Sequence, residues 1–160
     1  MELERKFLVK KLPELDKKSK VEYERYYIDD FIKNQIRVQK KNGKIYEYET
    51  KFLQRDKFVN KLTPITQGEF LGMTKKNKKK IVRENYKPVG MENVSVAIYK
   101  GAHEGLIRAE FRFATVTEAI AFNPPAWVGR EITSTPLALD AHINKLSREE
   151  FVTELQKTDC

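Results

Sequence analysis

The segment ELERKFLV, residues 2–9, carries charged side chains at every second position, at Glu2, Glu4 and Lys6. Alternate residues of a β-strand share one face of the sheet, so this spacing predicts a strand with one charged face. The same spacing returns in two later segments, at Glu47, Glu49 and Lys51 and at Arg108, Glu110 and Arg112. The opposite faces of these segments are partly apolar and could pack against helices.

Most of the chain is predicted to form strands, over residues 2–10, 21–28, 35–41, 44–52, 56–63, 79–86, 93–99 and 105–114. Asn42-Gly43 suits a two-residue hairpin turn, because both central residues of such a turn need positive φ. Capping-box patterns predict three short helices, which begin after Thr66, Thr115 and Ser147. The predicted fold class is mainly β (α+β). The strand count favours a small antiparallel barrel, with a β-sandwich as the competing architecture.

The composition indicates a single globular domain that binds an anion. The chain has 160 residues, of which 31 are Lys or Arg and 23 are Asp or Glu, for a net charge of +8. This charge favours a nucleotide, polyphosphate, nucleic acid or acidic membrane surface as partner. No apolar run approaches the roughly 20 residues of a membrane span, and the N-terminal segment does not resemble a signal peptide. Cys160 is the one cysteine, so a reducing compartment, the cytoplasm, is expected.

The pattern Glu2-x-Glu4-x-Lys6 resembles the opening E-x-E-x-K strand of the CYTH family, also called triphosphate tunnel metalloenzymes. Further stretches resemble the family in its order along the chain: Arg37 before the hairpin, Gly105-Leu106-Ile107 with Ala109-Glu110, and PPAWVGREIT at residues 124–133. The last of these is very similar to the family's P-P-x-W-hydrophobic-G-x-E-hydrophobic-T stretch. The resemblance therefore covers residues 1–160 as one CYTH-like domain.

The resemblance implies a closed, eight-stranded antiparallel barrel, or tunnel, with a few short helices packed outside. Family members include inorganic triphosphatases, thiamine triphosphatases and class IV adenylyl cyclases. In such proteins basic residues hold a triphosphate, and carboxylates hold Mg²⁺ or Mn²⁺. A strongly hydrated polyanion leaves water only for a site in which several cations converge on it.

By this resemblance, the residues that contact phosphate are Lys6, Arg37, Gln39, Lys51, Arg83 and Arg112, and the metal ligands are Glu2, Glu4 and Glu110. Gln39 stands where the family has a second arginine, so it keeps the hydrogen bonds and loses the charge. A two-residue hairpin would place Lys51 on the opposite face from Arg37, whereas a bulge or a three-residue turn would restore it. The alternative for Arg83 is a solvated basic strand, because a lysine run precedes it.

Two departures weaken the expected metal site. Ala97 stands at the position of an aspartate ligand, and Arg112 replaces the second carboxylate of the later acidic pair. A cation on the same face as Glu110 repels a divalent ion by several kcal/mol at a few ångströms (roughly 4 kcal/mol per unit charge at 4 Å). Binding of Mg²⁺ or Mn²⁺ is therefore expected to be weakened. In the alternative, Arg112 pairs with Glu110 and the metal still binds nearby.

The sequence thus predicts a protein that binds a phosphate-rich nucleotide or polyphosphate in a basic barrel, with catalysis weakened or lost. Sequestering or sensing a signalling nucleotide would fit this prediction. The alternative is an active Mg²⁺- or Mn²⁺-dependent triphosphate hydrolase or nucleotidyl cyclase. A second alternative is an RNA-binding module that uses the exterior lysines, whose binding would fall steeply with salt. No membrane partner is expected.

Overall fold

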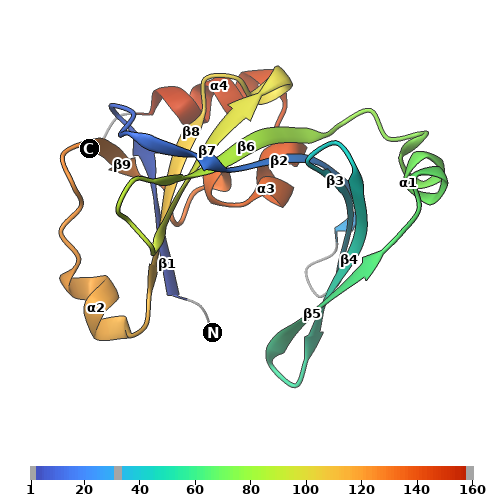
Figure 1. Cartoon of the computed structure of the whole chain (residues 1–160), viewed down its shortest axis with the longest axis horizontal. Coiled ribbons are helices and arrows are strands. Elements are labelled where there is room, and N and C mark those ends of the chain that lie inside the picture. The colour runs from blue at the N-terminus through green and yellow to red at the C-terminus, as the bar shows by residue number, and fades with distance from the viewer. Residues whose placement is uncertain (1–2, 31–33, 158–160) are drawn as a thin grey trace. The chain divides into compact units, whose positions relative to one another are not determined.

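The computed structural model describes residues 3–30 and 34–157. Its strands are β1 (Leu3–Val9), β2 (Leu15–Asp30), β3 (Asn34–Lys41), β4 (Ile45–Gln54), β5 (Lys57–Pro64), β6 (Ile81–Pro88), β7 (Val94–Lys100), β8 (Ile107–Phe113) and β9 (Val128–Glu131) (Figure 1). Its helices are α1 (Gln67–Thr74), α2 (Val116–Ala121), α3 (Asp140–Lys145) and α4 (Arg148–Gln156), with 3₁₀ turns η1 (Gly101–His103) and η2 (Pro136–Ala138). No helix within these residues is long and apolar enough to cross a bilayer.

The strands form one sheet in the order β5-β4-β3-β2-β6-β7-β8-β1-β9. The prediction of a mainly β, antiparallel fold with few helices is confirmed. Eight strands were predicted and nine are present within the described residues, since β9 lies in the PPAWVGREIT segment, where no strand was predicted. No hydrogen-bonded pairing among the described residues joins β5 to β9, so the sheet is not closed by hydrogen bonds and the closed barrel is not shown.

The chain divides into two compact units, described separately below. The first unit comprises residues 1–20 and 84–160, and the second comprises residues 21–83. The prediction of one domain over residues 1–160 stays a prediction.

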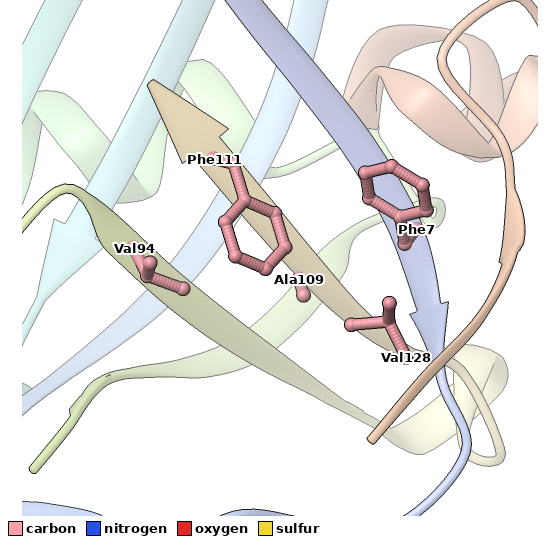
Figure 2. Packing of buried hydrophobic residues seen from close by; sticks show 5 residues of the cluster. All are labelled: Phe7, Val94, Ala109, Phe111 and Val128. Carbon is pink, nitrogen blue, oxygen red and sulfur yellow. The ribbon is translucent and has the colours of Figure 1, made fainter. Parts of the chain in front are cut away.

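The core of the first unit lies on one face of β1, β7, β8 and β9. β1 pairs antiparallel with β8, with Phe7 opposite Ala109. Phe7, Val94, Ala109, Phe111 and Val128 are all buried in this core (Figure 2). The ring centroids of Phe7 and Phe111 are 5.7 Å apart in an edge-to-face arrangement, a geometry that aromatic pairs prefer. The odd-numbered residues of β1 and β8 thus lie on the face of this core, and their even-numbered residues occupy the other face.

A surface network joins β1 to β9 and α2. The Arg5 guanidinium donates to both carboxylate oxygens of Glu131, at 2.6 and 3.0 Å, and to the carbonyl oxygen of Ala119 at 2.9 Å. The Thr133 hydroxyl donates to the same carboxylate at 2.7 Å. Glu131 and Thr133 of the PPAWVGREIT segment therefore hold β1 in place through hydrogen bonds.

The turn between β3 and β4 differs from the prediction. Lys41 pairs with Ile45, so the turn contains three residues, and the two-residue turn was wrong. Asn42 and Gly43 do adopt positive φ, of 53° and 70°. The extra residue changes the register, because it places Arg37 opposite Glu49 and Gln35 opposite Lys51. Lys51 therefore lies on the same face of the sheet as Arg37.

Helix α1 packs on the opposite face of the second unit. Thr66 caps it in a capping box with Glu69, as predicted. Its one buried residue, Phe70, lies 5.7 Å from the ring of Tyr26 and 5.1 Å from that of Tyr46, measured between centroids. Because α1 packs on that face, the face that carries Arg37 and Lys51 is the opposite one.

Candidate functional site

The first unit presents what we call the first charged face, formed by Glu4 and Lys6 of β1 and by Arg108, Glu110 and Arg112 of β8. The register pairs Lys6 with Glu110 and Glu4 with Arg112, so charges alternate across the two strands. The sequence spacing predicted this shared face correctly. Glu2 lies outside the described residues.

Glu4 and Glu110 form a carboxyl pair on this face. Burial, together with the hydrogen bond and the negative charge of Glu110, raises the pKa of Glu4 to about 7. Burial acts to raise the pKa of Glu110 also, but the hydrogen bond from Glu4 and the charges of Lys6 and Arg108 outweigh it, so that pKa is lowered. Near pH 7 the Glu4 carboxyl group is therefore protonated in part of the molecules, and its proton forms the hydrogen bond that joins the pair.

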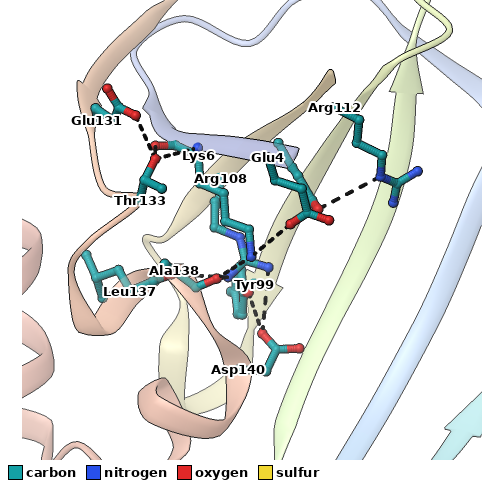
Figure 3. Close-up of polar contacts among 11 residues, drawn as sticks. Glu4, Lys6, Tyr99, Arg108, Arg112, Glu131, Thr133, Leu137, Ala138 and Asp140 are labelled. Carbon is teal, nitrogen blue, oxygen red and sulfur yellow. Dashed lines mark hydrogen bonds and ion pairs between the residues drawn. The ribbon is translucent and has the colours of Figure 1, made fainter. Parts of the chain in front are cut away.

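Two cations of the first charged face are fixed by the segment that follows β9 (Figure 3). The Lys6 ammonium donates to the carbonyl oxygen of Ala138 at 2.7 Å. The Arg108 guanidinium donates to the same oxygen at 2.9 Å and to that of Leu137 at 3.1 Å. Burial and the nearby charge of Arg108 lower the pKa of Lys6. Both cations are therefore positioned by backbone carbonyls far along the chain.

Asp140, at the start of α3, completes this buried arrangement. The Tyr99 hydroxyl donates to one of its carboxylate oxygens at 2.6 Å, and an Arg108 nitrogen lies 3.9 Å from the same oxygen (Figure 3). Tyr99 and Asp140 were not among the predicted site residues. Neither residue stands in a charge alternation, so no local signal could have found them.

Arg112 differs from the other two cations because its side chain is 56% exposed. Its Nε lies 3.9 Å from an oxygen of Glu110, the loose ion pair that the sequence analysis left open as an alternative. Ala97 is buried directly opposite Arg108 in the β7–β8 pairing and contributes no polar group. Arg112 is thus the cation of this face that is most accessible to a ligand.

The second unit presents what we call the second charged face, which carries Tyr23, Arg25, Tyr27, Arg37, Gln39, Glu47, Glu49, Lys51 and Arg83. Gln39 links two charged residues: its carbonyl oxygen accepts from Arg25 at 2.8 Å, and its amide donates to Glu47 at 2.8 Å. Arg37 donates to Glu49 at 2.6 Å. Tyr27 and Glu49 raise the pKa of Arg37 despite its burial. Gln39 thus forms hydrogen bonds to Arg25 and Glu47, and its contact with phosphate stays a prediction.

An aromatic ring lies against two buried guanidinium groups on this face. The Arg25 Cζ is 4.3 Å from the centroid of the Tyr23 ring, and the Arg83 Cζ is 5.0 Å from it. Such cation–π contacts stabilise arginine where water is excluded. Arg25 was not among the predicted site residues, although its alternation with Tyr23 and Tyr27 in the sequence places all three on one face of β2.

Lys80 belongs to a different cluster from Arg83. Its ammonium donates to Glu24 at 2.9 Å, and Lys40 lies 3.0 Å from the other oxygen of that carboxylate. Because Glu24 and Lys40 are even-numbered neighbours of Arg25 and Gln39, this ion-pair cluster lies on the other face of the sheet.

The described carboxylates fit a divalent cation poorly. Within residues 3–30 and 34–157 there is no group of three or more His, Cys, Asp or Glu side chains that could hold a metal ion. Glu4 and Glu110 offer two carboxylates, but these are hydrogen-bonded to each other, with Lys6 and Arg112 beside them. A hard cation such as Mg²⁺ needs several oxygen ligands and would have to displace the proton that the pair shares.

The fold is similar to that of solved structures. Neither a protein-family model nor a curated protein matches the sequence. The inorganic triphosphatase NE1496 is 24% identical, with a TM-score of 0.69, over 92% of this chain and 96% of that protein's chain. A second structure, of the hypothetical protein NE1496, is 26% identical, with a TM-score of 0.62, over 84% of this chain and 90% of that one. The resemblance of this chain to the CYTH, or triphosphate tunnel, family is therefore confirmed in its fold.

Proposed function

We propose that the chain binds a small molecule that bears a triphosphate, either a nucleotide or a polyphosphate. One observation carries the proposal: the first charged face gathers Lys6, Arg108 and Arg112 around a carboxyl pair that can share a proton. Its three cations outnumber its two carboxyl groups by one, and protonation of Glu4 increases this excess, which suits a polyanion. The similar fold of an inorganic triphosphatase supports the same class of ligand.

Under this proposal Lys6 and Arg112 contact phosphate in the first unit, and Arg37, Gln39, Lys51 and Arg83 contact phosphate in the second. The roles follow from their chemistry. Arginine guanidinium groups offer paired donors to phosphate oxygens, and each charge-assisted contact contributes about 1.5–3 kcal/mol.

We further propose that metal-dependent turnover is weak, which would suit a protein that sequesters or senses its ligand. The support is the poor fit of the described carboxylates to a divalent ion. The second candidate is a metal-dependent triphosphate hydrolase or nucleotidyl cyclase. The adjacency of Glu4 and Glu110 favours that candidate, because the deprotonated pair could ligate one Mg²⁺ or Mn²⁺, which would stabilise the charge on the transferring phosphoryl group.

Calorimetry with tripolyphosphate and with ATP, each in EDTA and then in Mn²⁺, tests both proposals. We expect binding in EDTA that Arg112→Ala weakens roughly ten- to a hundredfold, the equivalent of one charge-assisted contact. Lys100→Ala, an exposed lysine at the end of β7, is the matched control and should bind as the wild type does. Phosphate release is measured in the same samples.

The outcomes separate the candidates. If neither ligand binds, the proposed function is wrong. Rapid phosphate release that EDTA abolishes would establish the hydrolase in place of the binder. If Arg112→Ala leaves the affinity in EDTA unchanged, Arg112 serves only as a partner of Glu110.

A further inference from the structure

Strands β4 and β5 form a hairpin that ends in a turn at residues 55–56 (Figure 1). Exposed apolar side chains of this hairpin lie on the second charged face. The register pairs Leu53 with Phe58 and Glu49 with Leu62. Leu53 is two residues from Lys51 in β4, so both side chains lie on one face of the sheet. Phe58 and Leu62 lie opposite residues of that face, so all three apolar side chains share the face of Lys51 and Arg37. We call these three residues the apolar patch. Their exposed fractions are 38%, 56% and 51%.

The apolar patch adjoins the cations directly. The Lys51 ammonium lies 4.9 Å from the centroid of the Phe58 ring. Leu62 is at the end of a row that runs across neighbouring strands from Arg37 through Glu49. Neighbouring strands are about 4.8 Å apart, so Leu62 lies about 10 Å from Arg37 along this row. A ligand held by Arg37 and Lys51 would therefore meet Phe58 and Leu62 next.

Inorganic polyphosphate would leave this patch exposed to water. A nucleotide would cover it, because its base has a flat π-face that stacks on aromatic side chains whatever the base. We propose, building on the proposed triphosphate binding, that the ligand is a nucleotide, with phosphate at Arg37 and Lys51 and its base on Phe58 and Leu62. The juxtaposition of cations and exposed apolar side chains on one face is the ground for this choice.

A second copy of the chain is the competing occupant, since β5 is the last strand in the sheet order. The charges of β5 argue against it. Lys57 and Lys61 are both exposed on this eight-residue strand. Two copies paired through β5 would bring these lysines together, and lysines on edge strands are a common means of blocking such pairing. The positive charges of this hairpin repel a second copy of the chain and attract phosphate, so we favour the nucleotide as the occupant.

The experiment compares two phenylalanines of the same hairpin. Phe58 lies in the apolar patch, whereas Phe52, 41% exposed, pairs with Val59 on the opposite face of the sheet. Phe58→Ala, Phe58→Trp and Phe52→Ala are titrated with ATP, GTP, CTP, UTP and tripolyphosphate in EDTA. Stacking on one side chain corresponds to roughly a tenfold or larger change in the dissociation constant. The melting temperature and the mass in solution of each variant are measured alongside.

We expect Phe58→Ala to weaken at least one nucleotide about tenfold and to leave tripolyphosphate unchanged. Phe58→Trp should retain nucleotide affinity, and Phe52→Ala should match the wild type. Equal losses for nucleotides and tripolyphosphate, or no loss for any nucleotide, would overturn the inference while triphosphate binding stands. A wild-type dimer that Phe58→Ala dissociates, with nucleotide affinity unchanged, would assign the patch to a second copy. If no phosphate compound binds, the proposed function fails and this inference fails with it.

Discussion

The two charged faces hold their cations in different ways. On the first, Lys6 and Arg108 are bonded to the carbonyl of Ala138, which lies 132 and 30 residues away along the chain. On the second, Arg25 and Arg37 are bonded to side chains 14 and 12 residues away, on neighbouring strands. The first face thus depends on the correct placement of the C-terminal segment, whereas local strand register suffices for the second. Substitutions should therefore affect stability more on the first face than on the second.

Arg108→Met should give the largest effect. The change removes the guanidinium that lies 3.9 Å from the buried carboxylate of Asp140 and leaves the Leu137 carbonyl without its donor from Arg108. Removing one partner from a buried charged cluster typically costs about 3–5 kcal/mol. Urea unfolding, followed by circular dichroism, measures the loss. A loss below about 1 kcal/mol, the worth of a single ordinary hydrogen bond, would mean that the first face does not depend on this contact.

The shared proton of the first face should be visible by carboxyl NMR. Glu4 should titrate near pH 7, and Glu110→Gln should move its pKa down toward the ordinary range, because the repelling charge is replaced by an amide that can donate. Since the pKa of Glu4 is above its value of 4.5 in the unfolded chain, its stabilising contribution is complete below pH 4.5 and is lost as the pH rises through about 7. The lowered pKa of Glu110 acts in the opposite sense. A Glu4 midpoint that stays near 4.5 would show that the pair does not share a proton.

Arg37→Met should cost less than Arg108→Met. It leaves Glu49 without its 2.6 Å partner, but the Glu49 side chain is 16% exposed and can recruit water. We expect a loss of about 1–2 kcal/mol, the cost of one unmade charged hydrogen bond. The same urea experiment measures it. If Arg37→Met proves as damaging as Arg108→Met, the distinction between the two faces is wrong.

Glu131 lies outside both charged faces, so Glu131→Gln should give the smallest loss of stability among these variants. It weakens an ion pair with Arg5 in which the two side chains are 24% and 36% exposed. Partly exposed pairs contribute about 0.2–1 kcal/mol, so a small loss in thermal stability is expected, and high salt should reduce it further. Ligand affinity should not change. Loss of phosphate binding in this variant would show that the PPAWVGREIT segment does more than fasten β1.

Local spacing was enough to predict much of this protein. The alternation of Glu4 with Lys6 and of Arg108, Glu110 and Arg112 indicated a shared charged face, since side-chain direction in a strand is set by residue parity alone. The capping-box patterns predicted the starts of α1, α2 and α4 correctly, because a cap acts within one turn of the helix and is therefore also a local signal. Parity in β2 would also have found Arg25, had its alternation with the tyrosines been followed.

Other features were decided only by the tertiary structure. The face on which Lys51 lies depended on one extra residue in the turn after Lys41, a choice that Asn42-Gly43 does not settle. The partner of Lys6, the buried position of Asp140 and the raised pKa of Glu4 all require segments distant in sequence to meet. Desolvation and charge coupling arise from this packing, so no spacing of residue types reports them. The sequence by itself determined which side chains of one strand share a face, since residue parity sets side-chain direction. The fold decided how the faces of different strands combine, which cations are held in place and which can reach a ligand.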